Sequence, residues 1–232
     1  MGIVVREIDR ADRAVVDALG VFGVATIHEA QERTGLLEPE IRPIYPGARI
    51  SGSAVTVSVP PGDNLMIHVA VEVCREGDVL VVAPMAPSNA GYLGELLATA
   101  LAFREVRGVV IDAGVRDVAA LQRMGFPVWS RHISAYGTVK ETLGDVNVPV
   151  VCASQVVRPG DVVVADDDGV VVVPRAHAEA VRSASAEREQ KEALSRSRYE
   201  AGELSLDVHS MRSGLEAKGL RYVDEGPDGE PG

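Results

Sequence analysis

The sequence predicts an α/β fold in which parallel strands are joined by helices, and three observations indicate this class. The first is a β-branched apolar run over 109–111, between glycine-containing turns, which is typical of a buried strand. The second is a change of period, because apolar residues recur at helical spacing over 118–124 and Gly125 can end that helix. The third is the apolar run 79–82, of the kind buried on both faces of a parallel sheet. With a further strand at 126–129, the chain contains a strand–turn–helix–strand unit.

The residues before this unit predict further elements. A weak amphipathic pattern predicts a helix over 9–19, and a second helix is expected to start at Thr26 as N-cap and end near Gly35. Alternating small and β-branched residues predict a strand over 51–59, and a helix is expected over 64–74.

The residues after this unit predict a hairpin and then a helical region. A strand is expected over 148–153, and the runs 162–164 and 170–173 form a hairpin around an Asp168-Gly169 turn. The three aspartates before Gly169 suggest a metal, but the turn accounts for them. Residues 175–224 are expected to form a helical C-terminal arm with a thin apolar stripe, which suggests packing against another subunit. Residues 225–232 are expected to be disordered.

Composition limits the function. The formal charge of −11 argues against nucleic-acid binding, which requires clustered Lys and Arg. The only cysteines, Cys74 and Cys152, are far apart in apolar runs, so they predict buried thiols rather than a zinc site or a disulfide. We see no signal peptide and no apolar run that could span a bilayer, and therefore expect a cytoplasmic protein without membrane contact.

Two turns carry candidate functional groups. Arg116 and Asp117 follow the strand at 109–111, where they offer a cation for a carboxylate and an oxygen ligand for a divalent metal. Gly94-Glu95-Leu96-Leu97 opens a helix after the strand at 79–82, and its backbone N–H groups could hold a carboxylate. Consecutive βα turns lie at the same edge of a parallel sheet, so we expect the two turns to meet.

Each of these signals has a structural alternative. Asp117 could serve only as a helix N-cap beside a solvated Arg116, and Glu95 could be a first-turn acid that favours the helix dipole. Glu29 lies three residues after Thr26 and could complete a capping box. Lys140 is a candidate cation for the pocket or an isolated surface residue. The sequence has no Walker motif and no GxGxxG after a strand, which argues against a nucleotide-cofactor enzyme, and it also has no GxSxG or HExxH motif.

These motifs, taken together, carry a family resemblance. The sequence contains the turn 94–97, IDAGVRD, MGFPVWSR, VNVPVVC, PGDVVVADDDGVVVVP and GLRYVD. With them it resembles the 4-hydroxy-4-methyl-2-oxoglutarate aldolases, also called 4-carboxy-4-hydroxy-2-oxoadipate aldolases, within a wider group that includes the regulator of ribonuclease E activity A. The resemblance covers about 22–224 and implies one aldolase-like domain over 1–224.

The resemblance implies a fold, an assembly and a site. The fold would be an α/β core similar to the swivelling phosphohistidine domain, with helical N- and C-terminal arms. The protein would be a homotrimer or homohexamer with sites between subunits. Arg116 would bind substrate, Asp117 would hold Mg²⁺ or Mn²⁺, and the amides of 94–97 would hold the pyruvyl carboxylate, with Glu95 as the acid of the loop. Glu29 and Glu192 are the candidates for an acid supplied by a neighbouring subunit.

The implied activity is that of a class II pyruvate aldolase of aromatic-compound catabolism, with oxaloacetate decarboxylation as a side reaction. A small keto acid would be cleaved to pyruvate and a second keto acid. Two alternatives stay open, a non-catalytic regulator of a ribonuclease E-type enzyme and a dedicated oxaloacetate decarboxylase. Schiff-base chemistry at Lys140 is the rival mechanism.

Overall fold

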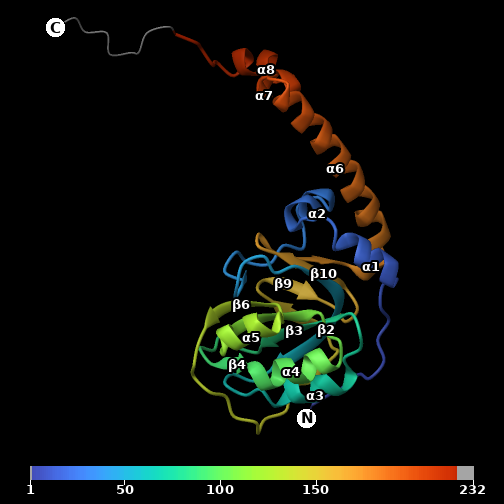
Figure 1. Cartoon of the computed structure of the whole chain (residues 1–232), viewed down its shortest axis with the longest axis vertical. Coiled ribbons are helices and arrows are strands. Elements are labelled where there is room, and N and C mark those ends of the chain that lie inside the picture. Colours follow the sequence, from blue (N-terminus) through green and yellow to red (C-terminus); the bar gives the residue numbers. More distant parts are fainter. Residues whose placement is uncertain (1, 224–232) are drawn as a thin grey trace, which may run out of the picture. The chain divides into compact units, whose positions relative to one another are not determined.

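The computed structural model describes residues 2–223, and the chain divides into two compact units, Met1–Arg188 and Glu189–Gly232 (Figure 1). The first unit contains a nine-stranded mixed sheet with helices, which confirms the predicted α/β class. The predicted tail, 225–232, lies outside the described residues. No helix within 2–223 combines the length and the apolar character needed to cross a membrane.

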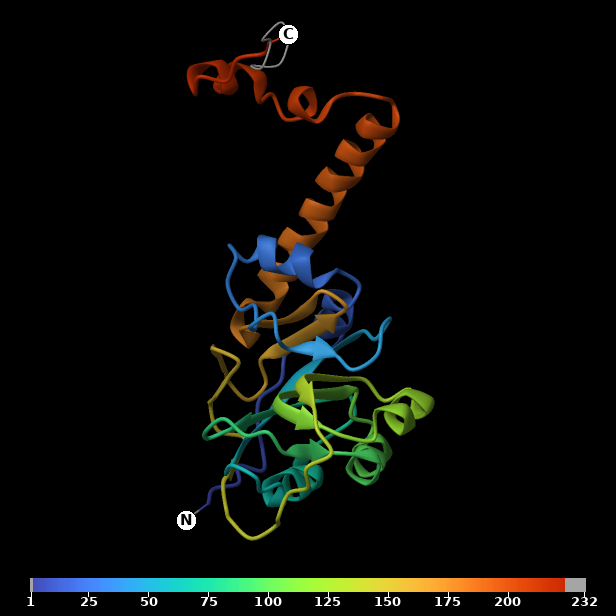
Figure 2. The ribbon, with the colours of Figure 1, turned by 90° about the vertical axis from the view of Figure 1, so that its left-hand side faces the viewer.

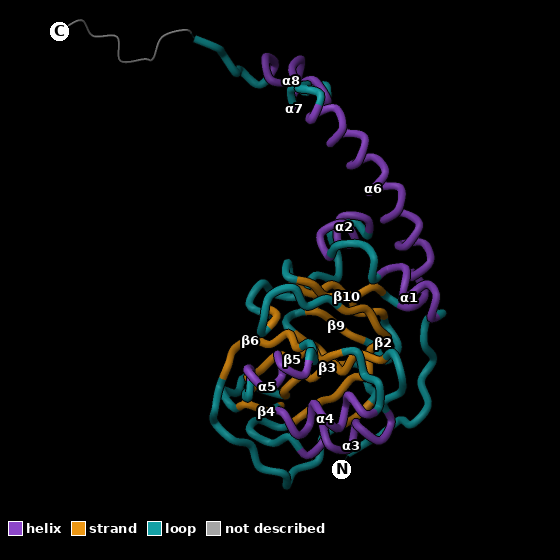
Figure 3. Tube along the Cα trace, viewed as in Figure 1, coloured by secondary structure: helices purple, strands orange, loops and turns teal. Residues whose placement is uncertain are grey.

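Four parallel strands form the centre of the sheet. They are β2 (Ile50–Val59), β3 (Asp78–Pro84), β5 (Gly108–Val115) and β6 (Val128–Ile133), in the order β6-β5-β3-β2. The connecting helices are α3 (Leu65–Val73), α4 (Glu95–Phe103) and α5 (Val118–Met124). Figure 3 shows these helices together over the parallel strands, and Figure 2 gives the side view. The βα turns therefore lie at one edge of the sheet.

Antiparallel strands extend this centre on both sides. The hairpin β10 (Val162–Asp166) and β11 (Gly169–Val173) pairs with β2, while β1 (Arg42–Pro43) pairs with β6. The sheet curls until its ends approach, because the Trp129 indole N–H donates to the Asp166 carbonyl (2.8 Å) and Arg42 donates to the Asp168 carbonyl (2.5 Å). The result is a nearly closed, barrel-like sheet; similarity to the phosphohistidine domain stays a prediction.

The remaining short strands border this sheet. They are β4 (Gly91–Leu93), which pairs with β5, β7 (Asp145–Val146), which pairs with β2, and the separate hairpin of β8 (Val150–Cys152) and β9 (Gln155–Val157). A buried apolar cluster lies between α3, α4 and the sheet, and a second one contains Trp129 and the β8–β9 hairpin. Burial raises the pKa of the Cys74 thiol to about 12 and also raises that of Cys152, so both cysteines are inert thiols.

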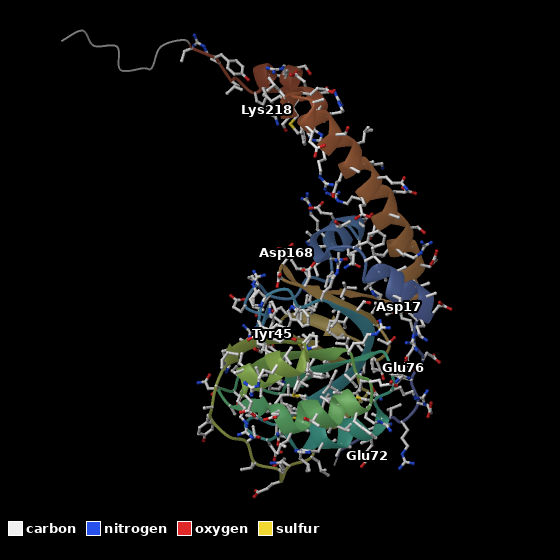
Figure 4. All side chains as sticks on the ribbon, in the orientation of Figure 1. Asp17, Tyr45, Glu72, Glu76, Asp168 and Lys218 are labelled. Atoms are coloured by element: carbon white, nitrogen blue, oxygen red, sulfur yellow. The ribbon has the colours of Figure 1, made fainter. Side chains whose placement is uncertain are left out.

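The N-terminal helices α1 (Arg13–Leu19) and α2 (Val24–Ala30) pack on β10 and β11 in a third apolar cluster. Arg13 of α1 pairs with both Asp17 and Glu76, which are labelled in Figure 4. The predicted N-cap at Thr26 is wrong, because the N-cap is Gly23 and Thr26 lies inside α2. The Asp166 carboxylate accepts from the Val24 N–H at 2.9 Å, so a residue distant in sequence caps this helix.

The C-terminal helices follow the hairpin. A short 3-10 turn, η1 (Arg175–His177), leads into α6 (Ala178–Glu200), and α7 (Ser205–Val208) and α8 (Arg212–Ala217) follow. The unit boundary at Arg188–Glu189 falls within α6. Inside the second unit, Tyr199 and His209 share a hydrogen bond of 2.6 Å, and Arg198 pairs with Glu203 at 2.5 Å. These contacts fold the chain after α6 back onto the end of that helix.

Candidate active site

The two predicted turns meet at the edge of the sheet. Strand β4 runs directly into α4, and it pairs in parallel with the end of β5, Leu93 opposite Val115. The Arg116 N–H donates to the Leu93 carbonyl at 2.9 Å. The backbone that carries the Arg-Asp pair is therefore bonded to the backbone that opens α4, as the sequence predicted for two consecutive βα turns.

The turn after β5 begins later than Gly114, the residue that bounds the strand in the sequence. Gly114 lies inside β5, which continues to Val115, because it pairs with Gly91 on one side and His132 on the other. The reversal occurs at Asp117, whose backbone is left-handed (φ 59°, ψ 33°). Asp is among the few non-glycine residues that tolerate this conformation.

The Asp117 side chain caps the neighbouring helix rather than its own. Asp117 occupies the N-cap position of α5, and its carbonyl accepts from the Ala120 and Leu121 N–H groups, but its side chain accepts no hydrogen bond from that helix. Its Oδ2 instead accepts from the Glu95 N–H at 3.0 Å, at the start of α4. Within 2–223 no hydrogen bond or ion pair engages its other oxygen, Oδ1. The N-cap interpretation was thus partly right, but the capped helix lies 22 residues earlier in the sequence.

The start of α4 retains two backbone donors. The Ala98 N–H is the first that bonds back along the chain, to the Gly94 carbonyl at 3.0 Å. Among the described contacts, none takes the N–H of Leu96 or Leu97. Glu95 is exposed, the Leu96 side chain is 87% exposed and Leu97 is buried, so this first turn opens outward. Such a turn can accept an anion.

Arg116 lies beside the same turn. Its Nε is 3.9 Å from Asp117 Oδ2, and the two side chains are 48% and 43% exposed. The loop 134–144 borders it, because the Gly91 N–H donates to the Tyr136 carbonyl at 2.7 Å and a Cβ on Gly137 would lie 3.9 Å from Arg116 Nη1. The guanidinium is thus half-exposed and has no bidentate partner among residues 2–223, which leaves it able to bind a carboxylate.

Lys140 has no described contact with the two turns. The residues after Lys140 bind the turn that precedes α3, since the N–H groups of Glu141 and Thr142 donate to Asp63 at 2.8 and 2.7 Å. Burial lowers the pKa of the His68 ring, and the charge of Lys140 adds to this effect. No described contact joins Lys140 to Arg116 or Asp117, so its catalytic role stays a prediction.

The two acids proposed for a subunit interface also stay predictions. Glu29 pairs with Arg33 at 3.0 Å and with Arg188 at 3.7 Å, and its side chain is 33% exposed. Glu192 belongs to the second compact unit. Neither residue has a described contact with Arg116 or Asp117 that would assign it to the site.

The described donor groups fit a divalent cation only at a site with a single protein carboxylate. Among the described residues, no group of three or more His, Cys, Asp or Glu side chains could hold a metal ion. Asp117 offers one carboxylate oxygen without a hydrogen bond. Mg²⁺ commonly binds through one or two carboxylates and fills its other positions with water and substrate oxygens. The residues therefore fit a single-carboxylate site, and they do not fit a cation enclosed by protein ligands.

Sequence reasoning missed an ion-pair network around Asp112, which lies inside β5. Arg131 donates Nε to Asp112 and Nη2 to Glu38 (2.6 Å), and Asp112 also accepts from the Ala153 N–H at 2.8 Å. Hydrogen bonds from Ser154 and Arg131 lower the pKa of Glu38. The network lies beside a cavity of about 490 Å³ under the loop 84–89, which contains no residue of the two turns. The one available signal was an acid, Asp112, within an apolar strand.

Comparisons with known proteins point to one family. A family model described as "RraA-like: Aldolase/RraA" matches residues 14–172. A protein of Halalkalibacterium halodurans named "Putative 4-hydroxy-4-methyl-2-oxoglutarate aldolase" is 30% identical over 190 residues, which cover 82% of this chain and 88% of the relative. A protein of Deinococcus radiodurans with the same name is 32% identical over 149 residues, covering 63% of this chain and 91% of the relative.

A solved structure extends the likeness to the fold. The crystal structure of Streptomyces coelicolor RraAS2, described as "an unusual member of the RNase ES inhibitor RraA protein family", has a TM-score of 0.74 and 29% sequence identity. The match covers 82% of this chain and 99% of that one. The names in this group thus include both aldolases and a ribonuclease inhibitor family.

Proposed function

Because the chain belongs to the RraA-like family, we propose that it is an aldolase that cleaves a 4-hydroxy-2-keto acid such as 4-hydroxy-4-methyl-2-oxoglutarate or 4-carboxy-4-hydroxy-2-oxoadipate. The products would be pyruvate and a second keto acid. The observation that carries this proposal is the contact between the two turns, where the Glu95 N–H meets the Asp117 carboxylate at 3.0 Å with Arg116 alongside. The resulting surface combines N–H donors, a guanidinium and a free carboxylate oxygen, which suits a keto acid and a cation together.

In this proposal the start of α4 and Arg116 bind the substrate. The N–H groups of Leu96 and Leu97 would donate to the carboxylate beside the keto group, where the helix dipole favours negative charge. The Arg116 guanidinium would approach the C2 oxygen, on which negative charge develops. This arrangement fixes the keto-acid end and leaves C4 toward Glu95.

The reaction would begin with removal of the C4 hydroxyl proton. Glu95, exposed at the mouth of the turn, is the candidate base, directly or through a water. The C4–O bond becomes a carbonyl as the C3–C4 bond breaks, and its electron pair forms the enolate of pyruvate. Arg116 stabilises the C2 oxyanion, and protonation at C3 releases pyruvate. Oxaloacetate decarboxylation would yield the same enolate through loss of carbon dioxide.

Asp117 is the residue that would hold Mg²⁺ or Mn²⁺. The cation would supply Lewis-acid stabilisation of negative charge on substrate oxygens. The protein's contribution is the orientation of one carboxylate, since the bond from the Glu95 N–H fixes Oδ2 and leaves Oδ1 available.

A pyruvate-release assay tests the proposal. The purified protein is supplied with 4-hydroxy-4-methyl-2-oxoglutarate and Mg²⁺, with and without a chelator, and pyruvate is measured by a coupled dehydrogenase. We expect release that the chelator abolishes and that excess Mg²⁺ restores. Borohydride trapping of a pyruvate adduct would instead support the Schiff-base route, and Lys140→Ala would identify its amine.

A regulator is the second candidate, and its support is the likeness to a member of the RNase ES inhibitor RraA family. Inhibition of an RNase E-type enzyme by a protein that releases no pyruvate would favour it. A dedicated oxaloacetate decarboxylase is the third, and relative rates on the two substrates distinguish it. The homotrimer or homohexamer, the sites between subunits and the cytoplasmic location belong to this proposal, and sedimentation analysis of the purified protein tests the assembly.

A further inference from the structure

We propose that Gly94 is a positioning residue for Asp117, because the absence of a side chain at position 94 lets the Asp117 carboxylate cap α4. The purpose that we assign to Gly94, to hold one Asp117 oxygen ready for a cation, rests on the proposed function. The geometry of the contact itself is independent of any activity.

The first argument is steric. A Cβ on Gly94 would lie far inside 3.0 Å of Asp117 Oδ2, a separation that real Cβ atoms essentially never show. The same Cβ would lie 3.1 Å from both Cγ and Nε of Arg116, so it would press on both functional side chains. The Gly94 backbone is extended (φ −147°), and any residue can adopt that conformation. Glycine is therefore needed here for space and not for backbone freedom.

The second argument is that the Asp117 side chain can avoid an added methyl group only by giving up its hydrogen bond to α4. Its left-handed backbone and the bond from the Arg116 N–H to the Leu93 carbonyl hold the turn against β4. The oxygen in question already accepts from the Glu95 N–H. An added methyl group would thus displace the carboxylate and break its hydrogen bond to α4, since the backbone on both sides is fixed.

The chain contains a matched control. Gly23 is also a helix N-cap, and the helix that follows it is also capped by a distant aspartate, through the Val24 N–H and Asp166 Oδ2 at 2.9 Å. A Cβ on Gly23 would lie 3.7 Å from Asp166 Oδ2, an ordinary van der Waals contact. The same change to alanine therefore leaves Asp166 in place at position 23 but requires Asp117 to move at position 94.

The test compares Gly94→Ala with Gly23→Ala in the full chain. Mn²⁺ binding is measured by electron paramagnetic resonance, which reports the cation without turnover. We expect Gly94→Ala to weaken Mn²⁺ binding about tenfold or more, the range seen when a group that orients a metal ligand is lost. Gly23→Ala should bind Mn²⁺ within about twofold of the wild type, because its aspartate keeps its place. Equal affinities for the two variants would overturn the inference.

A second measurement separates the geometry from the function. In an Asp117→Gly background the obstructing oxygen is gone, so Gly94→Ala should lower the thermal midpoint less than it does in the wild type. Gly23→Ala should shift the midpoint equally in both backgrounds. Equal effects of Gly94→Ala in both backgrounds would overturn the positioning role. If the wild type bound no Mn²⁺ and released no pyruvate, the proposed function and the purpose assigned to Gly94 would both be wrong. A smaller thermal effect of Gly94→Ala in the Asp117→Gly background would then support only the steric contact between positions 94 and 117.

Discussion

Replacement of Asp117 by glycine should separate stability from activity. The left-handed backbone at φ 59° favours glycine over a residue with a Cβ by about 1 kcal/mol. The lost cap on the Glu95 N–H, which Asp117 Oδ2 accepts at 3.0 Å, costs about 1 kcal/mol. The two effects oppose each other, so the free energy of unfolding of Asp117→Gly should stay within about 1 kcal/mol of the wild type.

Asp117→Ala is the matched comparison. Alanine loses the same cap and keeps the left-handed backbone that the wild type already has, so only the lost cap contributes, about 1 kcal/mol of destabilisation relative to the wild type. Urea unfolding of the three proteins measures both values. Glycine should thus be the more stable replacement, which reverses the usual order inside regular structure.

The activity of these two variants should not follow their stability. Both lack the carboxylate that is proposed to bind the cation, so both should lose Mg²⁺-dependent pyruvate release and Mn²⁺ binding. An Asp117→Gly protein that is folded and still releases pyruvate with Mg²⁺ at the wild-type rate would refute the assignment of Asp117. An alanine variant more stable than the glycine variant would refute the strain argument.

Three further outcomes are expected. Arg116→Ala should lower kcat/KM for pyruvate release by about 100-fold, as expected for the loss of an oxyanion donor, and near-normal rates would exclude this role. Burial acts to raise the pKa of Asp63, but the N–H donors of Leu65, Glu141 and Thr142 outweigh it and lower the pKa. The stability contributed by this carboxylate is therefore present above its unfolded pKa of about 3.9 and is lost as the pH falls through the lower folded value, so urea midpoints of Asp63→Asn should depend less on pH in this range than those of the wild type. Lys140→Ala should retain pyruvate release, and its loss together with a borohydride-trapped adduct in the wild type would favour the Schiff-base route.

The sequence alone determined the class of the fold and the edge at which the two turns lie. Apolar runs such as 79–82 and 109–111, separated by helical periodicity, allow few arrangements other than parallel strands with crossover helices. Because consecutive crossovers share a hand, residues 94–97 and 116–117 had to reach the same edge of the sheet. Local chemistry also fixed the hairpin turn at Asp168-Gly169 and the end of α5 at Gly125, whose φ is 63°.

Only the tertiary structure decided which groups pair across these elements. Thr26 has a side chain that suits an N-cap, but α2 begins at Val24, and the Val24 N–H donates to Asp166, which lies on a strand far along the chain. Asp117 likewise caps α4 instead of α5, and only the packed structure reveals why position 94 must be glycine. Caps and ion pairs of this kind depend on distances between segments that share no local pattern, so spacing within the sequence does not contain them. Periodicity is a property of one segment, whereas a hydrogen bond between two turns exists only after both have been placed.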